Sequence, residues 1–265
     1  MKNSVFLLVL ISLSLFAFSQ ENPTAQWAKN NIVIDGNIND WNSQLKHYDN
    51  ETSLFFDFKN DSTNLYLCFQ TKNEMNQSKI MQSGMKIILS DKSNGKHKAI
   101  INFPLADKYA AKKVEAPDKI KPDPLSTHQT RQAAFLLSDT MMELKGFINQ
   151  NGLISIKNIS GVNAAINWDS ANTLTYEIKI PLKELYGNDY EERDVAKGIS
   201  MNVVINAMSV SDAKKNMENE YSGRSHLGED RVGAAPGGNY QDRYNRAVMF
   251  QKTELKQKIV LSAQN

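Results

Sequence analysis

Apolar and polar residues alternate along many short segments of this chain, a pattern typical of β-strands that bury one face. In the clearest segment every second residue is large and apolar, and the residues between are polar: Leu174, Tyr176, Ile178 and Ile180 against Thr175, Glu177 and Lys179. The same period, or a run of β-branched residues, predicts further strands at 32–34, 53–59, 65–71, 85–91, 96–103, 142–149, 153–157, 164–168, 199–209, 247–252 and 256–262.

Turn signals separate these segments. Asn94-Gly95 and Asn151-Gly152 predict hairpins, because both residue types accept positive φ. Only short helices are predicted between strands: residues 74–82, ended by Gly84, and a turn that begins at Pro181 and ends at Gly187. The predicted fold class is all-β: an antiparallel β-sandwich with short helical turns and long loops.

Two segments interrupt the succession of strands. Residues 105–132 are rich in lysine and proline, which predicts a long surface insertion that is either merely solvated or functional. Residues 211–245 combine glycines with arginines and tyrosines, which predicts a second long loop.

Residues 1–19 have the order of a secretory signal peptide: Lys2, an apolar run, and then the small residues Ala17 and Ser19. We therefore expect cleavage before Gln20, a single domain at 20–265, and export to the periplasm, the cell surface or the medium. The apolar run is shorter than the about 20 residues of a membrane-spanning helix. No membrane span is expected once this peptide is removed.

Composition excludes some partners. The chain of 265 residues is 41% hydrophobic, enough for one sizeable core. Its net charge of +2 gives no electrostatic reason to expect nucleic acid or an anionic membrane as partner. The single cysteine, Cys68, cannot form an internal disulfide, and its apolar neighbours predict a buried, unreactive thiol.

No enzymatic activity is expected. The sequence contains no Gly-x-Ser-x-Gly, no His-Glu-x-x-His and no Gly-Lys-Ser/Thr phosphate loop, and its four histidines are far apart. Acidic pairs occur by chance in any β-domain of this size, so the carboxylates alone do not indicate glycoside hydrolysis.

Two motifs stand near opposite ends of the predicted domain. In 32–41, Ile-Val-Ile-Asp-Gly-Asn-Ile-Asn-Asp-Trp, a strand leads into the Asp35-Gly36 turn, a short helical turn starts at Asp40, and Trp41 is expected in the core. In 176–185, Tyr-Glu-Ile-Lys-Ile-Pro-Leu-Lys-Glu-Leu, a strand carrying a glutamate runs into Ile-Pro and a turn closed by leucine.

Both motifs resemble those of the family 9-like carbohydrate-binding modules, secreted bacterial β-sandwiches that are jelly-roll-like and related to DOMON-like domains. The resemblance implies a non-catalytic module that binds a glycan or polysaccharide. It leaves two rival interpretations open. One is a haem-binding or redox-associated sandwich of related fold, and the other is a surface or assembly interaction protein.

Sugar rings present apolar C–H faces that stack on aromatic rings, while their hydroxyls take hydrogen bonds from polar side chains. Such residues gather at the end of the strand 164–168 and in the second long loop; the predicted ligand residues are Trp168, Arg224, Arg231, Tyr240 and Tyr244. Trp168 either stacks a sugar or closes one end of the sandwich. The alternative for the loop is a long crossing whose glycines permit turns. Trp27, before the first motif, is expected to cover a sheet edge.

The resemblance also implies a possible structural calcium ion. Oxygen ligands suited to calcium stand near predicted strand ends: Asp57, Asp61, Glu74 and Asp91. None of them is assigned as a ligand by its position in a motif. No other cofactor is expected.

Overall fold

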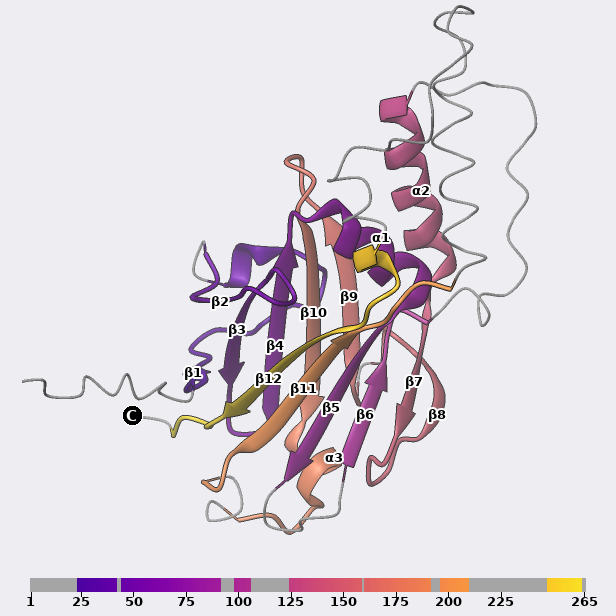
Figure 1. Ribbon diagram of the computed structural model, residues 1–265. Coiled ribbons are helices and arrows are strands. Elements are labelled where there is room, and N and C mark those ends of the chain that lie inside the picture. Colours follow the sequence, from indigo (N-terminus) through magenta and orange to yellow (C-terminus); the bar gives the residue numbers. More distant parts are fainter. Residues whose placement is uncertain are drawn as a thin grey trace, which may run out of the picture.

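A computed structural model of the chain describes residues 23–41, 44–91, 98–105, 124–158, 160–191, 196–209 and 247–263. Two six-stranded sheets pack face to face, and their strands are antiparallel apart from the pair β1–β3. The predicted all-β sandwich is confirmed. In Figure 1 the strands of the second sheet cross in front of those of the first.

The first sheet has the order β1-β3-β4-β10-β9, with β2 paired to β3. Its strands are β1 (Gln26–Trp27), β2 (His47–Asp49), β3 (Leu54–Asn60), β4 (Asn64–Thr71), β9 (Asn163–Trp168) and β10 (Leu174–Pro181). The second sheet has the order β12-β11-β5-β6-β7-β8. Its strands are β5 (Met85–Asp91), β6 (Lys98–Asn102), β7 (Met141–Lys145), β8 (Gly152–Ser155), β11 (Ile199–Ile205) and β12 (Thr253–Ile259).

The main core lies between the two sheets and follows the alternation read from the sequence. One row across the first sheet aligns Phe56, Phe69 and Tyr176, and the rings of the last two stack with centroids 6.1 Å apart. Ile87 and Val203, from the second sheet, are fully buried in the same cluster. The apolar face of each strand is therefore the inner face of the sandwich.

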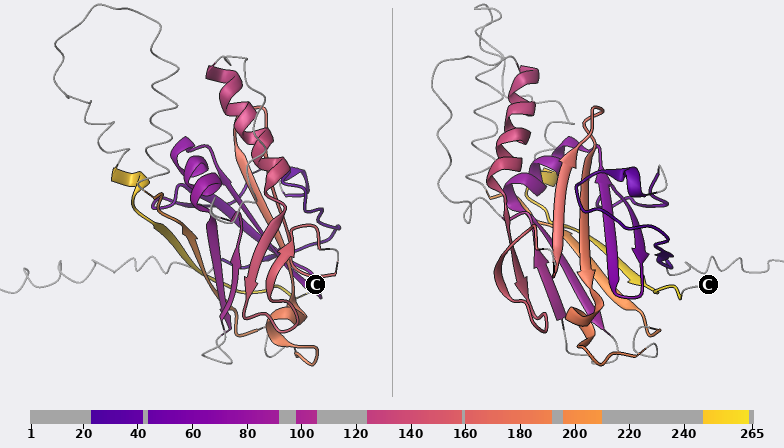
Figure 2. Two further views of the ribbon diagram at one scale, coloured as in Figure 1. Left: turned by 90° about the vertical axis from the view of Figure 1, so that its right-hand side faces the viewer. Right: turned by 180° about the vertical axis from the view of Figure 1, so that it is seen from behind.

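The helices lie at the two ends of the sandwich (Figures 1 and 2). Helices α1 (Glu74–Ser83) and α2 (Pro124–Ser138) are at one end, and α3 (Leu182–Tyr186) is at the other. The side chain of Asn73 caps α1, and Gly84 ends it with φ of +78°. Pro181 precedes α3, and Gly187 ends it with φ of +94°. The helix and helical turn predicted from these signals are confirmed.

A small second core lies on the outer face of the first sheet. There the N-terminal segment packs Ile32, Trp41 and Leu45 against Tyr66 and Cys68 of β4. The view from behind in Figure 2 shows this segment crossing the strands. Trp41 is 2% exposed and Cys68 is fully buried, as predicted. Trp27 lies on β1 at the sheet edge, also as predicted.

The predicted strand at 32–34 is wrong. This segment pairs with no strand in the described structure, and a backbone donor in it goes to a side-chain carboxylate. Val33 N bonds to Asp40 Oδ2 at 2.8 Å. The short helical turn Ile38–Asp40 ends at Asp40 instead of starting there, and Asn37 is its N-cap.

Other differences concern the long segments. Helix α2 begins inside the predicted insertion 105–132, whose residues 106–123 lie outside the described residues. The predicted strand at 247–252 is wrong, because residues 247–249 are helical, and the final strand is Thr253–Ile259. The pairing strands β1 and β2 were not expected from the sequence. They are only two and three residues long, too short for a periodic signal.

Candidate functional site

Trp168 is the last residue of β9 and lies where α1 and α2 meet the sandwich. Its indole Nε1 donates a hydrogen bond to Oε1 of Gln77 in α1 at 3.0 Å. Its ring meets Phe135 of α2 edge-to-face, with the ring centroids 5.7 Å apart. The half-buried side chain also packs against the main core. This geometry suits a residue that closes the end of the sandwich, one of the two roles expected for it.

The other predicted ligand residues, Arg224, Arg231, Tyr240 and Tyr244, lie outside the described residues. A glycan-binding role for them and for Trp168 stays a prediction.

The two sequence motifs meet at a buried carboxylate on the outer face of the first sheet. Glu177 of β10 accepts hydrogen bonds from Trp41 Nε1 at 2.6 Å, Gly36 N at 2.7 Å and Asp35 N at 3.1 Å. Burial raises the pKa of Glu177, because it disfavours the charged form, and the three N–H donors oppose that rise. One side chain thus fixes a segment about 140 residues away in the chain.

Gly36 is required at this junction for two reasons. Its φ is +78°, a conformation that other L-residues rarely adopt. A Cβ there would also lie 2.6 Å from Asn167 Cβ, so the backbone of the N-terminal segment rests directly on β9. The Asp35-Gly36 turn expected from the sequence is therefore a point of close contact between the N-terminal segment and the sheet.

The ionisable side chains around the junction contact backbone, amide and aromatic groups of the N-terminal segment. Lys59 Nζ donates to the carbonyl of Asp40 at 2.6 Å and lies 5.2 Å from the centre of the Trp41 ring. Burial lowers the pKa of Lys59. Asp57 accepts a hydrogen bond from Gln26 Nε2 at 2.9 Å. These contacts hold the N-terminal segment in place, so the junction is structural.

A row of outward-facing side chains that includes two exposed rings lies beside the junction, at the α1 end of the same outer face. In register across five strands it contains Tyr48 of β2, Phe55 of β3, Gln70 of β4, Thr175 of β10 and Asn167 of β9. We call these five residues the aromatic row. Tyr48 and Phe55 are 49% and 45% exposed, and their ring centroids are 4.6 Å apart. Gln70 Nε2 donates to Thr175 Oγ1 at 2.9 Å.

The aromatic row combines two exposed rings with amide and hydroxyl groups on one surface. Its polar members are half-buried or buried, and the N-terminal segment borders the row at Asn167. Phe55 carries a sequence signal in hindsight, because it is a large aromatic residue at an outward position of an alternating strand. Tyr48 carries none, since β2 is too short to be predicted.

A cavity lies at the opposite end of the sandwich, beside α3. Its volume is about 480 Å³, within the usual range for ligand pockets. It is lined by Thr63, Asn64, Ser160, Lys179, Pro181, Lys183, Asn188 and Tyr190. The Tyr190 hydroxyl donates to the carbonyl of Ser62 at 3.0 Å. This lining suits a small polar or negatively charged group, and Tyr190 contributes its one aromatic ring.

The suggested calcium ligands are not brought together. Within the described ranges no three acidic, histidine or cysteine side chains are close enough to hold a metal ion. Asp61 instead organises its own turn, accepting from Thr63 N, Asn64 N and the Tyr66 hydroxyl, each at 2.7 Å. Among the described helices, none is long and apolar enough to cross a membrane.

Comparison with known proteins yields a distant structural likeness. No protein-family model matches the chain, and no curated protein matches it. Two solved structures of a family 9 carbohydrate binding module from Caldicellulosiruptor kristjanssonii are similar to it. The complex with cellotriose has 12% identity and a TM-score of 0.33, over 72% of this chain and 78% of that one. The complex with glucose has 11% identity and a TM-score of 0.35, over 91% and 96%.

Proposed function

We propose that this chain is an exported, non-catalytic module that binds a glycan on the outer face of its first sheet. The observation that carries the proposal is the aromatic row. Two exposed rings stand in register with amide and hydroxyl side chains, the combination that a sugar needs for stacking and for hydrogen bonding.

The position of the row suits the middle of a glycan chain. Tyr48 and Phe55 are neighbours across β2 and β3, so a sugar ring resting on them would have Gln70 within one strand spacing, about 4.8 Å. The surface is exposed at the rings, so a polymer could continue past it. Binding at so shallow a surface is expected to be weak, because little area is buried and sugar–water hydrogen bonds must be replaced.

The test is affinity electrophoresis of the purified protein through gels that contain neutral soluble polysaccharides, followed by calorimetry with the best ligand. Tyr48→Ala and Phe55→Ala should each weaken binding about tenfold, as loss of a central aromatic contact does. Tyr48→Phe should retain most of the affinity, because it keeps the ring. Leu153→Ala is the matched control, since Leu153 is 61% exposed on β8 of the other sheet.

Two further variants test the other locations. Trp168→Ala probes the site predicted from the sequence, and Asn188→Ala probes the cavity beside α3. If Tyr48→Ala and Phe55→Ala bind normally while a folded Trp168→Ala or Asn188→Ala variant loses binding, the site is not the aromatic row. If the protein binds none of a broad set of neutral and acidic glycans, the function itself is refuted.

A further inference from the structure

The outer face of the second sheet carries an excess of positive charge. The side chains that point outward from its strands include five lysines, Lys86, Lys98, Lys145, Lys256 and Lys258, and two glutamates, Glu143 and Glu254. The difference, five minus two, is a formal charge of +3, whereas the whole chain carries +2. Positive charge is therefore concentrated on this face, which we call the lysine face.

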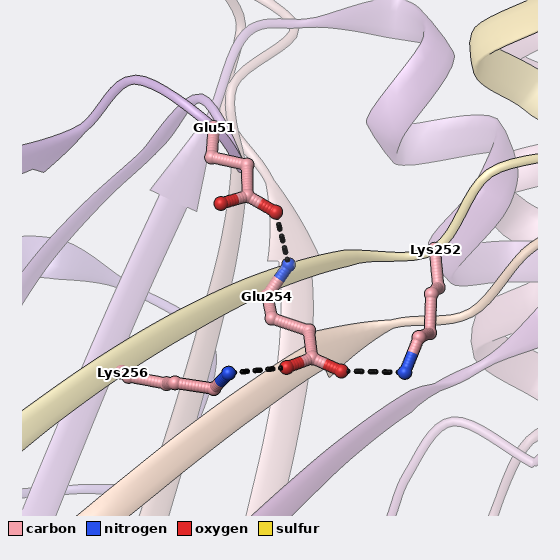
Figure 3. Close-up of polar contacts among 4 residues, drawn as sticks. All are labelled: Glu51, Lys252, Glu254 and Lys256. Atoms are coloured by element: carbon pink, nitrogen blue, oxygen red, sulfur yellow. Dashed lines mark hydrogen bonds and ion pairs between the residues drawn. The ribbon is translucent and has the colours of Figure 1, made fainter.

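Both glutamates are already paired with lysine. Glu254 binds Lys252 at 2.7 Å and Lys256 at 3.0 Å, and its backbone N–H donates to Glu51 (Figure 3). The hydrogen bonds from Lys252 and Lys256 lower the pKa of Glu254 to about 2. Glu143 binds Lys145 at 2.8 Å, which lowers the pKa of its carboxyl. Lys252 and Glu51 lie beyond the end of the lysine face. Their opposite charges cancel, so including them would not change the charge of +3.

Two of the other lysines, Lys98 and Lys258, bracket a row of small polar residues. Lys258, Ser200, Ser90 and Lys98 are in register on four successive strands. The Cα atoms of the two lysines are thus about 14–15 Å apart, which is three strand spacings. The next row runs from Lys256 through Asn202, Ile88 and Ile100 to Lys145.

This face is open in the described structure. The helices stand at the two ends of the sandwich, and no described helix or strand covers the outer side of β11, β5 and β6 (Figures 1 and 2). The first sheet differs, because the N-terminal segment covers much of its outer side.

We propose that the lysine face binds an acidic polysaccharide laid across the strands, with its carboxylates at the lysines and its hydroxyls at Ser90 and Ser200. This surface is separate from the aromatic row and does not depend on it. A polymer whose acidic groups recur along one chain can reach lysines on several strands at once, which multiplies individually weak contacts.

The chemistry of the face favours a glycan over other polyanions. All its cations are lysines, so it lacks the forked guanidinium groups that match phosphate. No aromatic ring stands between Lys98 and Lys258 on which a nucleic-acid base could stack. The apolar residues among the lysines, Ile88 and Ile100, are half-buried, so they do not protrude as lipid-inserting side chains would.

The test uses polygalacturonate and its fully methyl-esterified form, two polymers with the same sugar backbone whose carboxyl groups are charged in one and esterified in the other. Binding to the full purified protein is measured by biolayer interferometry. The variant Lys86→Gln/Lys98→Gln/Lys258→Gln removes three lysines of the face. Its matched control, Lys29→Gln/Lys46→Gln/Lys72→Gln, removes three exposed lysines of the N-terminal segment and of the connection between β4 and α1. Both variants change the net charge equally.

We expect the face variant to bind polygalacturonate about tenfold more weakly than the control variant does. We also expect the methyl ester not to bind, and binding to vanish at about 1 M salt, where the Debye length is about 3 Å. Equal losses in the two triple variants would overturn the proposal, as would equal affinity for the ester.

Duplex DNA and phosphatidylglycerol vesicles complete the experiment. If either binds the protein as tightly as polygalacturonate does, and the face variant loses that binding too, the surface is a general polyanion site and the proposal fails. Loss of neutral-glycan binding in Tyr48→Ala, with polygalacturonate binding unchanged, would show that the two surfaces act separately. The experiment thus distinguishes failure of the lysine-face proposal from failure of the aromatic-row proposal.

Discussion

Glu177→Gln tests whether one buried carboxylate holds the N-terminal segment on the sheet. In the native junction Oε2 accepts from Gly36 N and Asp35 N, and Oε1 accepts from Trp41 Nε1. The amide of glutamine keeps one acceptor oxygen, which can serve both backbone donors. Its NH2 group must then face the indole N–H, so two donors oppose each other in a buried place.

The expected loss of stability follows from these contacts. A hydrogen bond to a charged group contributes about 1.5–3 kcal/mol, and a buried donor left without a partner costs about 1–3 kcal/mol. Removing the charge relieves part of the desolvation that raises the pKa of Glu177, which acts in the opposite direction. We expect Glu177→Gln to lower the free energy of unfolding by about 2–4 kcal/mol. That is a large share of a typical domain stability of about 5–15 kcal/mol.

The assay is urea unfolding of a double-mutant cycle with Trp41→Phe, which removes the indole N–H but keeps an aromatic ring. In that background no donor opposes the introduced amide, so Glu177→Gln should be less destabilising by about 1–2 kcal/mol. The reasoning is refuted if Glu177→Gln alone leaves the unfolding midpoint unchanged. It is equally refuted if the two substitutions add within about 0.5 kcal/mol.

Two further predictions concern the backbone and a buried cation. Gly36→Ala should destabilise the protein by more than about 1 kcal/mol in thermal unfolding, because of its φ and the 2.6 Å approach to Asn167; Gly152→Ala, at φ of +93° with no neighbour within 4 Å, should cost less. Lys79 is fully buried and donates to the carbonyl of Gln251 at 2.6 Å, and burial lowers its pKa. The unfolded chain therefore binds this proton more tightly, so stability should rise with pH from the folded pKa up to about 10.4. Lys79→Met should lack that rise in urea unfolding, and parallel pH profiles for the two proteins would contradict it.

Alternation predicted the strands of the core well, because a strand between two sheets must place every second residue inside. β3, β4 and β10 start and end within one residue of the predicted limits. The helix before Gly84 and the turn before Gly187 were predictable for a local reason, since both glycines have positive φ at the last turn. In each case the structure depends on residues close in the sequence.

The features that the sequence did not predict depend on contacts between residues that are far apart in the chain. Residues 32–34 have the β-branched pattern of a strand, but no described strand pairs with them, and Val33 N donates to the Asp40 carboxylate. β-propensity does not identify the hydrogen-bond partner. Tyr48 is a candidate ligand residue because it lies opposite Phe55 in the β2–β3 pair. The sequence did not predict this pairing, because β2 is only three residues long. Trp168 could be assigned to the end of a strand, but its contacts with α1 and α2 could not be foreseen.

The outward-facing polar residues of a strand can be buried under another segment or face solvent, and both cases occur in the described structure. Thr175 and Glu177 occupy outward positions of β10, where alternation predicts solvent, yet both are buried. Glu177 binds the N-terminal segment, and Thr175 accepts a hydrogen bond from Gln70. Lys86 and Lys98 occupy equivalent outward positions of the second sheet, which no helix or strand of the described residues covers. A buried acid such as Glu177 requires donors from a covering segment, whereas a lysine does not tolerate such a cover without a partner. Lys59, at an outward position of β3, meets this condition because it donates to the carbonyl of Asp40. Burial of an outward charge therefore follows from the hydrogen-bond partners that the covering segment supplies.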